Sequence, residues 1–423
     1  MVDSEVSEVE ERIAEAVASP ARLRAYLERH YGRPEAGALS SWERVEAALA
    51  HRQPDRVPFD FWAVPEVVAR LRKALDADEQ EVLRLLGVDC RMVTARYVGS
   101  KARDLPDGTF LDPWGTHRRH VANEFGVYDE YASYPLAKAE TAADVLNWEW
   151  ASPDDWDVSG VREQCQWLNA GGRYHLRYEV GGIFEWSWAL RGFERFLLDL
   201  VEKPEVACAI MDRFTDIYIE NTRRVIEAAG GLLDMVYTYD DVGIQGGLLM
   251  SARMWRKYIL PRHQRLNAAI RSASATELPS VVRSARYPVR IMYHSCGAVY
   301  PLIGAFVDEM GIDVLNPLQP RAAGMDMARI KAEFGDRLSF HGAIDIQHTL
   351  PHGTPAEVQA EVRERCVVLG RGGGYICTSA HYIQNDTPLE NIVAMYTTPR
   401  EYSEVTALSL DTRLSMLGKG RKP

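Results

Sequence analysis

The chain has 423 residues, of which 46% are hydrophobic, and its formal net charge is −11. This length fits one large α/β barrel, and the acidic balance repels a phosphate backbone, so nucleic acid is not expected as a partner. The N-terminus lacks the basic and apolar regions of a secretory signal, and no apolar run is long enough to span a membrane. The six cysteines are sparse and show no paired spacing, so we expect a cytoplasmic protein with no membrane partner.

The first part of the chain predicts a helical extension. Apolar residues recur at helical spacing between residues 5 and 31, and we assign residues 1–40 to this N-terminal extension. Ser41 is expected to cap the next helix, SWERVEAALAH, which Pro54 ends.

Short apolar runs then alternate with longer amphipathic ones. The amphipathic runs predict helices. Two of them follow each other with a break before Pro204, and the second ends at Gly230. Eight apolar runs have the length and the β-forming residues of buried strands. These predicted strands cover residues 57–62, 88–94, 174–180, 232–239, 289–295, 313–318, 338–344 and 374–379.

Eight strands with intervening helices predict an α/β fold, a (β/α)8 TIM barrel. A doubly wound open sheet is the alternative, but no glycine-rich dinucleotide motif follows the first strand. Turn residues and β-formers predict an inserted β-hairpin near 95–135, and residues 277–288 predict a loop insertion. We place the barrel domain at 41–405 and a C-terminal tail at 406–423.

Polar residues recur where the predicted strands end. In a barrel, the catalytic groups lie at this end, whereas a purely structural barrel does not need such a pattern. We therefore expect one cavity at the mouth of the barrel to be lined by Glu179, Asp240, Asp241, Gln319, His341 and His381. The full polar set at the strand ends comprises Glu179, Glu185, Asp240, Asp241, Gln245, His294, Cys296, Asn316, Gln319, His341, Asp345, Gln347, Cys377, His381 and Gln384.

His294 and Cys296 form a His-x-Cys pair at the end of the fifth strand, so both side chains can face one ion. Imidazole nitrogen and thiolate sulfur suit zinc, and Cys377 is the best candidate for a third ligand, which leaves one zinc position open. The alternatives are that the pair is a chance match and that Cys377 is a small core residue. Similarly, Asp240 and Asp241 could cap a loop, and His341 could be a core histidine.

Five segments carry a resemblance to a known family. They are SWERVEAALAHRQPDRVPFDFW, YTYDDVGIQGGLLMSARMWRKYILPRHQRL, YHSCGAVYPLIGAFVDEMGIDVLNPLQP, KAEFGDRLSFHGAIDIQHTLPHGTPAEV and GGGYICTSAHYIQNDTPLENIVAMY. With these segments the chain resembles the uroporphyrinogen-decarboxylase-like superfamily over roughly residues 41–400, nearly the whole barrel expected for that fold.

The resemblance is closer to the methyltransferase branch than to the decarboxylases. The decarboxylases carry an arginine-rich RQAGR motif near the first strand, where this chain has FDFWAVPEV. The methyltransferases bind zinc through a His-x-Cys pair and a later Cys, which fall here on His294, Cys296 and Cys377. They move a methyl group between a corrinoid and a thiol or a methylated or methoxylated substrate. No D-x-H-x-x-G cobalamin motif is visible, so the resemblance implies a corrinoid (methylcobalamin) carried by a partner protein.

The first interpretation is therefore a zinc-dependent, corrinoid-linked methyltransferase with a small-molecule substrate. A decarboxylase and a non-catalytic barrel that binds a tetrapyrrole or a partner are the alternatives, and a dimer is the oligomeric state that we consider. We expect Asp241, His341 and Asp240 to be catalytic, because titratable groups in a partly dry pocket can be tuned for proton transfer. The expected substrate-binding residues are Glu179, Gln245, Gln319, Asp345, His381 and Gln384.

Overall fold

The computed structural model describes residues 2–31, 38–123, 126–276 and 288–398. The chain divides into two compact units, which we call the central unit (Cys90–Met325) and the terminal unit (Met1–Asp89 with Asp326–Pro423). The predicted loop insertion at 277–288, except for its last residue, and the predicted tail at 406–423 lie outside the described residues. Among the described residues, no helix is long and apolar enough to cross a membrane.

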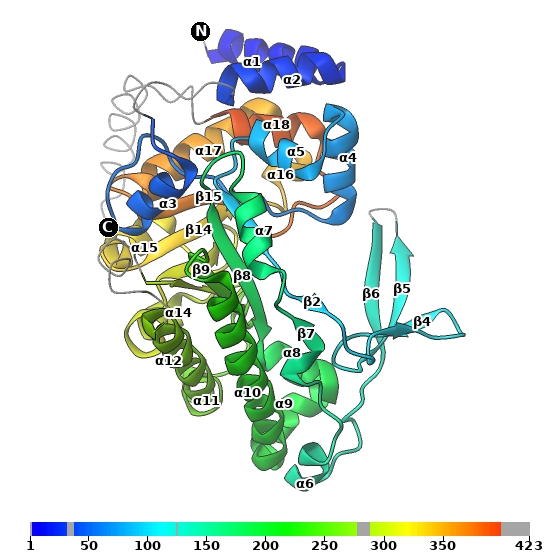
Figure 1. The fold of residues 1–423 in the computed structure, drawn as a ribbon. Coiled ribbons are helices and arrows are strands. Elements are labelled where there is room, and N and C mark those ends of the chain that lie inside the picture. Colours follow the sequence, from blue (N-terminus) through cyan, green and yellow to red (C-terminus); the bar gives the residue numbers. More distant parts are fainter. Residues whose placement is uncertain (1, 32–37, 124–125, 277–287, 399–423) are drawn as a thin grey trace. The chain divides into compact units, whose positions relative to one another are not determined.

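The central unit is built on parallel strands (Figure 1). Their order is β1-β8-β9-β12-β13, and neighbouring strands pair in parallel. Most of their side chains are buried, as expected for strands that are covered on both faces. The bounds are β1 Cys90–Val93, β8 His175–Gly182, β9 Met235–Tyr239, β12 Arg290–His294 and β13 Val314–Leu318.

The terminal unit contains two further parallel strands, β14 (Ser339–Ile344) and β15 (Tyr375–Ser379). The segment predicted as the first strand, 57–62, forms a parallel bridge to β15 at Phe59. Asp60 donates its N–H to the Cys377 carbonyl, while Cys377 donates to the Pro58 carbonyl. Seven of the eight predicted strands are therefore regular strands and one is a bridge, and the fold is the predicted α/β class with the strand–helix order of a (β/α)8 barrel.

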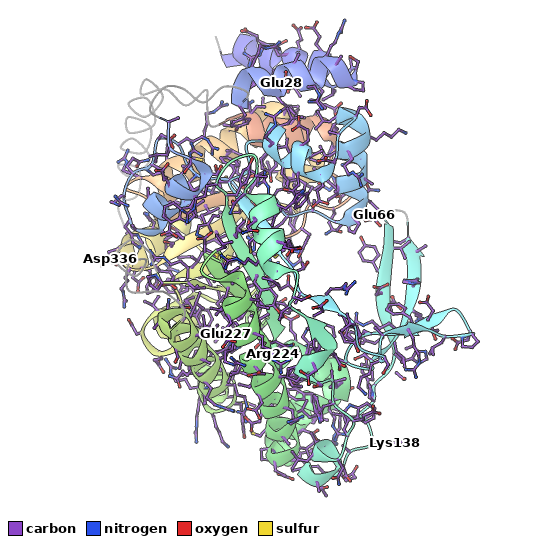
Figure 2. The ribbon with its side chains drawn as sticks, in the orientation of Figure 1. Glu28, Glu66, Lys138, Arg224, Glu227 and Asp336 are labelled. Atoms are coloured by element: carbon purple, nitrogen blue, oxygen red, sulfur yellow. The ribbon has the colours of Figure 1, made fainter. Side chains whose placement is uncertain are left out.

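The helices of the central unit cover its strands. The longest, α10 (Pro204–Ala229), starts with proline and ends at Gly230 in the left-handed conformation, which confirms the predicted break and stop. Its Arg224 and Glu227 are charged residues of the helix surface, where Arg224 pairs with Glu220 (Figure 2). The other central-unit helices are α6 Ala142–Leu146, η1 Pro153–Asp155, α7 Val161–Leu168, α8 Ile183–Arg191, α9 Phe193–Glu202, α11 Ala252–Tyr258, α12 Leu260–Thr276, α14 Tyr300–Ala305 and η2 Phe306–Met310.

The terminal unit carries the predicted N-terminal extension as α1 (Val2–Val17) and α2 (Pro20–Tyr31), and α1 packs on α17 and α18 (Figure 1). The predicted cap of the next helix is wrong by one residue. Ser40, not Ser41, is the N-cap, because its hydroxyl accepts the Glu43 N–H. The Glu43 carboxylate in turn accepts the Ser40 N–H, which completes a capping box. The other helices are α3 Ser41–Leu49, α4 Pro65–Leu75, α5 Glu79–Leu85, α15 Met327–Phe334, α16 Thr349–His352, α17 Pro355–Gly370 and α18 Leu389–Thr397.

The predicted hairpin insertion is present, and it is larger than one hairpin. Four antiparallel strands follow one another, and the β5–β6 hairpin projects away from β8 and β9 (Figure 1). The bounds are β3 Arg103–Asp104, β4 Thr109–Leu111, β5 His117–Asn123 and β6 Gly126–Ser133. Two short pairs complete the central unit: β2 Arg96–Tyr97 with β7 Trp156–Asp157, and β10 Gly243–Ile244 with β11 Gly247–Leu248.

A buried carboxylate joins the start of the chain to the first predicted strand. Asp89 has no solvent exposure and accepts hydrogen bonds from Arg44, from Arg56 and from the Phe59 N–H. Asp89 is thus the fully buried charge that Arg56 and Arg44 share, and Arg44 has a second carboxylate partner in Asp55.

We expect Asp89→Asn to lower the free energy of unfolding by about 3 kcal/mol, because it removes the buried carboxylate that pairs with Arg56 and one of the two that pair with Arg44. Urea unfolding followed by circular dichroism measures this loss. The matched control is Asp216→Asn, which breaks a half-exposed pair with Arg265 and should cost no more than about 1 kcal/mol. Equal losses in the two variants would contradict the assigned role of Asp89.

Candidate active site

The carboxyl ends of the central strands carry the candidate site. Parallel strands end at one edge of their sheet, so the residues after β8, β9 and β12 come together there. Asp240 and Asp241 follow directly after β9, and β12 ends in His294, which Ser295 and Cys296 follow.

The turn after β12 is held by its neighbours. Gly297 has φ +87°, and an added Cβ would lie 2.5 Å from the Gly243 backbone, so only glycine fits. Its N–H donates to Gln319 Oε1 at 2.8 Å. The N–H of Cys296 donates to Asp241 Oδ1 at 2.7 Å, so the loop after β9 fixes the cysteine backbone.

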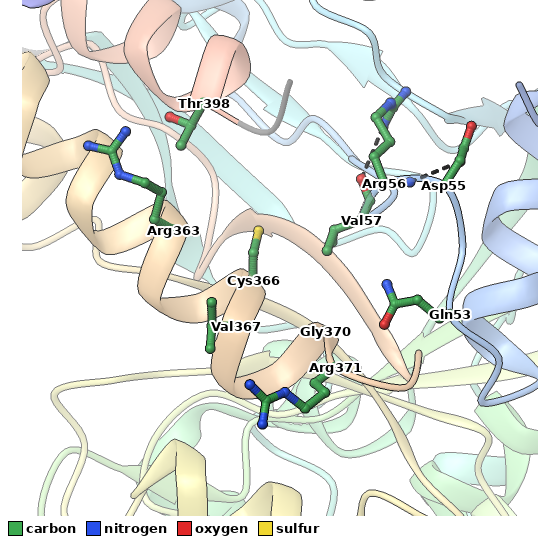
Figure 3. A pocket seen from close by; sticks show the side chains of 10 residues that line it. All are labelled: Gln53, Asp55, Arg56, Val57, Arg363, Cys366, Val367, Gly370, Arg371 and Thr398. Carbon is green, nitrogen blue, oxygen red and sulfur yellow. Dashed lines mark hydrogen bonds between the residues drawn. The ribbon is translucent and has the colours of Figure 1, made fainter. Parts of the chain in front are cut away.

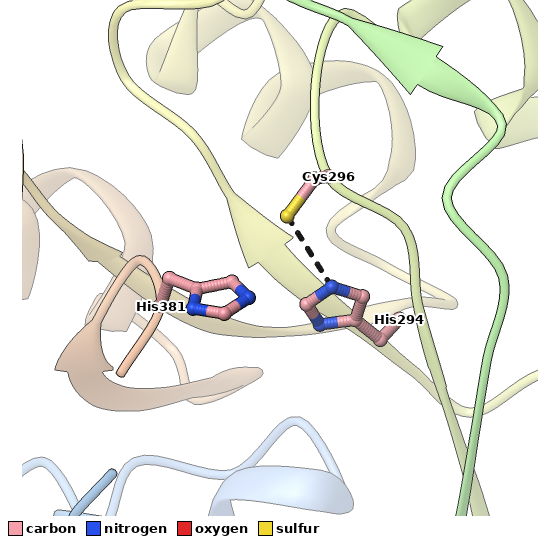
Figure 4. A group of neighbouring side chains, drawn as sticks. All are labelled: His294, Cys296 and His381. Atoms are coloured by element: carbon pink, nitrogen blue, oxygen red, sulfur yellow. Dashed lines mark hydrogen bonds between the residues drawn. The ribbon is translucent and has the colours of Figure 1, made fainter. Parts of the chain in front are cut away.

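His294 and Cys296 face each other within this turn (Figure 4). The Nε2 atom of His294 lies 3.3 Å from Cys296 Sγ and 3.3 Å from Asp241 Oδ1. The other ring nitrogen, Nδ1, contacts Asn316 Oδ1 on β13. An acceptor oxygen at Nδ1 favours the tautomer in which Nε2 is free to bind a metal ion.

The electrostatics of this group favour a positive charge beside the ring. Burial opposes a charged imidazole, but Cys296 and Asp241 hold the pKa of His294 well above its usual value. The ring nitrogen, the sulfur and the carboxylate oxygen thus form a group that favours a cation among them. A divalent cation would satisfy the same three atoms, so the donor set fits a metal ion such as Zn2+.

Three carboxylates surround this turn. Asp240 is fully buried, and its oxygens accept hydrogen bonds from His263 Nε2 and from the Glu185 N–H. Glu185, in the first turn of α8, accepts the Asp241 N–H at 2.8 Å. Burial, with Asp241 and Asp240 nearby, raises the pKa of Glu185 to about 8. Glu185 can thus hold or release a proton near neutral pH.

The predicted site residues of the terminal unit are placed differently. His341 is almost fully buried, with Nε2 2.9 Å from Asp60 Oδ2 and its ring against Trp62. The thiol of Cys377 is fully buried and hydrogen-bonds Cys366 of the covering helix α17. The Cys377 sulfur thus contacts α17, and its role as a zinc ligand stays a prediction.

The remaining predicted residues mostly make local contacts. Gln245 is exposed in the turn between β10 and β11, and Gln319 is the acceptor for the Gly297 N–H. Asp345 accepts the Gln347 N–H, and Gln384 donates to the Tyr382 carbonyl. His381 is half-buried beside Tyr382, and Glu179 is half-buried on β8 beside a cavity described below.

A different cavity, of about 240 Å³, lies in the terminal unit (Figure 3). Gln53, Arg56, Cys366 and Arg371 are among the residues that line it. These residues precede the first and the eighth strand, at the amino ends of the strands. Barrel active sites lie at the carboxyl ends, so this cavity is not the candidate site.

Comparison with known proteins agrees with the fold. A model of the uroporphyrinogen decarboxylase (URO-D) family matches residues 130–402, more than half of the chain. The chain belongs to the uroporphyrinogen decarboxylase family.

Two similar proteins come from Methanosarcina mazei. The methylated-thiol–coenzyme M methyltransferase is 26% identical over 194 residues, which are 45% of this chain and 43% of that protein. The chain therefore matches less than half of the length of this relative. A solved methyltransferase structure has a TM-score of 0.60 at 18% identity and covers 86% of this chain and 98% of that chain, which shows a shared fold. The predicted superfamily is confirmed.

The sequence assigned no specific role to three residues of this URO-D family member. Glu185 belongs to the polar set, but it lies in the first turn of α8 and not at a strand end. Asn316 also belongs to the polar set, and its contact with His294 gives it a role. Asp60 lies within the apolar first strand, where a buried carboxylate is itself a signal, since such a residue is rarely buried without a partner.

We expect the Glu185 carboxyl to titrate near pH 8 in the metal-free protein. Because this pKa lies above the unfolded value of 4.5, the folded state binds the extra proton, and the free energy of unfolding falls as pH rises between 4.5 and about 8. Glu185→Gln should flatten this fall. Carbon NMR of the labelled carboxyl, with urea unfolding across the pH range, measures both effects. A Glu185 titration midpoint near 4.5 would overturn the assignment.

Proposed function

We propose that this protein is a zinc-dependent methyltransferase that moves a methyl group between a corrinoid protein and a thiol or a methylated or methoxylated small molecule. The observation that carries the proposal is the convergence of His294 Nε2, Cys296 Sγ and Asp241 Oδ1 at the end of β12. The methyltransferase names of the two similar proteins support the reaction class.

The first two zinc ligands are His294 and Cys296. The ring orientation is already set by Asn316, as the oriented second contact of a metal-bound histidine requires. The Cys296 N–H donates a hydrogen bond to Asp241, which fixes the backbone of Cys296 and so restricts where its sulfur can lie. A histidine nitrogen and a cysteine sulfur together are typical zinc ligands.

The third ligand is proposed to be Asp241. Its Oδ1 lies 3.3 Å from His294 Nε2 and also accepts the Cys296 N–H, so it is already beside both other ligands. Its side chain is half-exposed, which leaves it free to turn toward an ion. Three protein ligands would leave one zinc position for the substrate.

A zinc ion at this position would lower the pKa of a bound thiol or polarise a leaving oxygen or nitrogen. Glu185 accepts the Asp241 N–H and so lies next to the proposed metal ligands. We assign it the role of general acid or base, which takes the proton from the reacting thiol or gives one to the leaving group. Asp241 is half-exposed, so one face of its carboxylate can also contact the substrate. Asp240 is a positioning residue, because His263 and the Glu185 N–H occupy its oxygens.

The charge of the site argues against the decarboxylase alternative. Porphyrinogen carboxylates need positive side chains, and the first strand lacks the arginine motif of the decarboxylases. Glu185, Asp240 and Asp241 instead surround the turn after β12, so a polycarboxylate would meet like charges there.

The purified full chain should contain about one zinc ion per site by mass spectrometry of the metal. Cys296→Ser and His294→Ala should lose the metal and methyl transfer from methylcobalamin to a thiol, and Asp241→Asn should lower both. Asn316→Ala should weaken zinc binding by roughly 10- to 100-fold.

The matched controls are Cys208→Ser on α10 and Cys377→Ala, which should both keep the metal. Zinc retained in Cys296→Ser would refute the ligand assignment. A zinc-loaded protein that transfers no methyl group to or from cobalamin, with any thiol or methoxylated substrate tested, would refute the reaction.

A further inference from the structure

A cavity of about 240 Å³ opens at the carboxyl ends of β1 and β8, in the central unit. Its volume is below that of pockets for drug-sized ligands, so a small chemical group fits it. Its lining is dominated by aromatic and apolar side chains with few polar groups. Trp114, Trp156, Tyr178, Tyr218, Glu179 and Asn221 are the members that matter here.

The aromatic residues form a connected wall. The ring of Trp114 lies 5.1 Å from that of Trp156 and 5.7 Å from that of Tyr218. Trp114, Tyr178 and Tyr218 are buried, and Trp156 is half-buried. The faces of such rings carry partial negative charge and attract organic cations.

Three polar side chains line the cavity beside the rings, those of Thr94, Glu179 and Asn221. The amide oxygen of Asn221 is buried and has no hydrogen-bond partner among the described residues. The Tyr218 hydroxyl already donates to the Gly182 carbonyl. Burial raises the pKa of the Glu179 carboxyl, and a cation bound beside it would favour its ionised form. None of the described residues that line the cavity is cationic, so a positive ligand group meets no like charge there.

We infer that this cavity is a binding subsite for a methylated onium group, a methyl-substituted ammonium or sulfonium, on the substrate of the proposed methyltransferase. Onium groups cannot donate strong hydrogen bonds, so their recognition depends on ring faces and a nearby negative charge. Glu179 pairs with Tyr237 on β9, the strand that lies between β8 and β12, so the subsite belongs to the same sheet as the turn after β12. The assignment of the onium group to a substrate rests on the proposed function, whereas the binding of the cation in the cavity does not.

The test compares ligands that differ only in charge. Isothermal titration calorimetry of the full chain with choline and with its neutral isostere, in which carbon replaces the ammonium nitrogen, should show at least about tenfold tighter binding of the cation. Tetramethylammonium and trimethylsulfonium, titrated separately, show which onium is preferred. Equal affinity for choline and its isostere overturns the inference without any variant.

Two substitutions place the binding in this cavity. Trp156→Leu and Glu179→Gln should each weaken choline binding by about tenfold. Trp167→Leu, at an exposed position of α7, is the matched control and should bind as the wild type does. Unchanged affinity in both cavity variants overturns the location.

Binding and methyl transfer are measured separately, so the two proposals can fail separately. If the protein binds the cation selectively but transfers no methyl group, the proposed function is contradicted and the cation subsite is supported. Methyl transfer by a protein that does not prefer the cation contradicts the subsite and leaves the proposed function.

Discussion

The Asp241 carboxylate holds the turn after β12, and the rest of the candidate site depends on that turn. One of its oxygens accepts the Cys296 N–H and also lies 3.3 Å from His294 Nε2. The loops after β9 and β12 approach so closely that neither Gly243 nor Gly297 can carry a Cβ without a clash. Because one carboxylate contacts the backbone of one candidate ligand and the ring of the other, the two ligands are positioned together.

The sequence predicted the strands well, but it could not predict which way their side chains point. Alternation of apolar and polar residues identifies the two faces of a strand only when one face is exposed to solvent. Barrel strands are buried on both faces, so they lack this pattern. Every residue of β15 is buried, so apolar spacing gave no sign that the Cys377 thiol faces Cys366 of α17. His294 and Cys296 could be paired from the sequence because they lie two residues apart at the end of one strand.

The polar residues at the strand ends serve two purposes that look the same in a sequence. Each tight turn leaves backbone N–H groups that need an acceptor, and Gln319 and Asp345 meet that need. Asp240 does the same for the Glu185 N–H while pairing with His263. Only the geometry separates these residues from Asp241 and Glu185, whose groups border the His294–Cys296 pair.

The acidic character of the central site has a consequence for how two positive ligands can bind there. Cys296 and Asp241 raise the pKa of His294, and burial raises the pKa of the Cys296 thiol. Zinc would bind the neutral imidazole and the thiolate, so it would displace the protons that this pair holds. The carboxyl group of the aromatic cavity is that of Glu179 on β8, which lies outside the group of His294, Cys296 and Asp241. The proposed metal site and the inferred subsite therefore use different carboxyl groups.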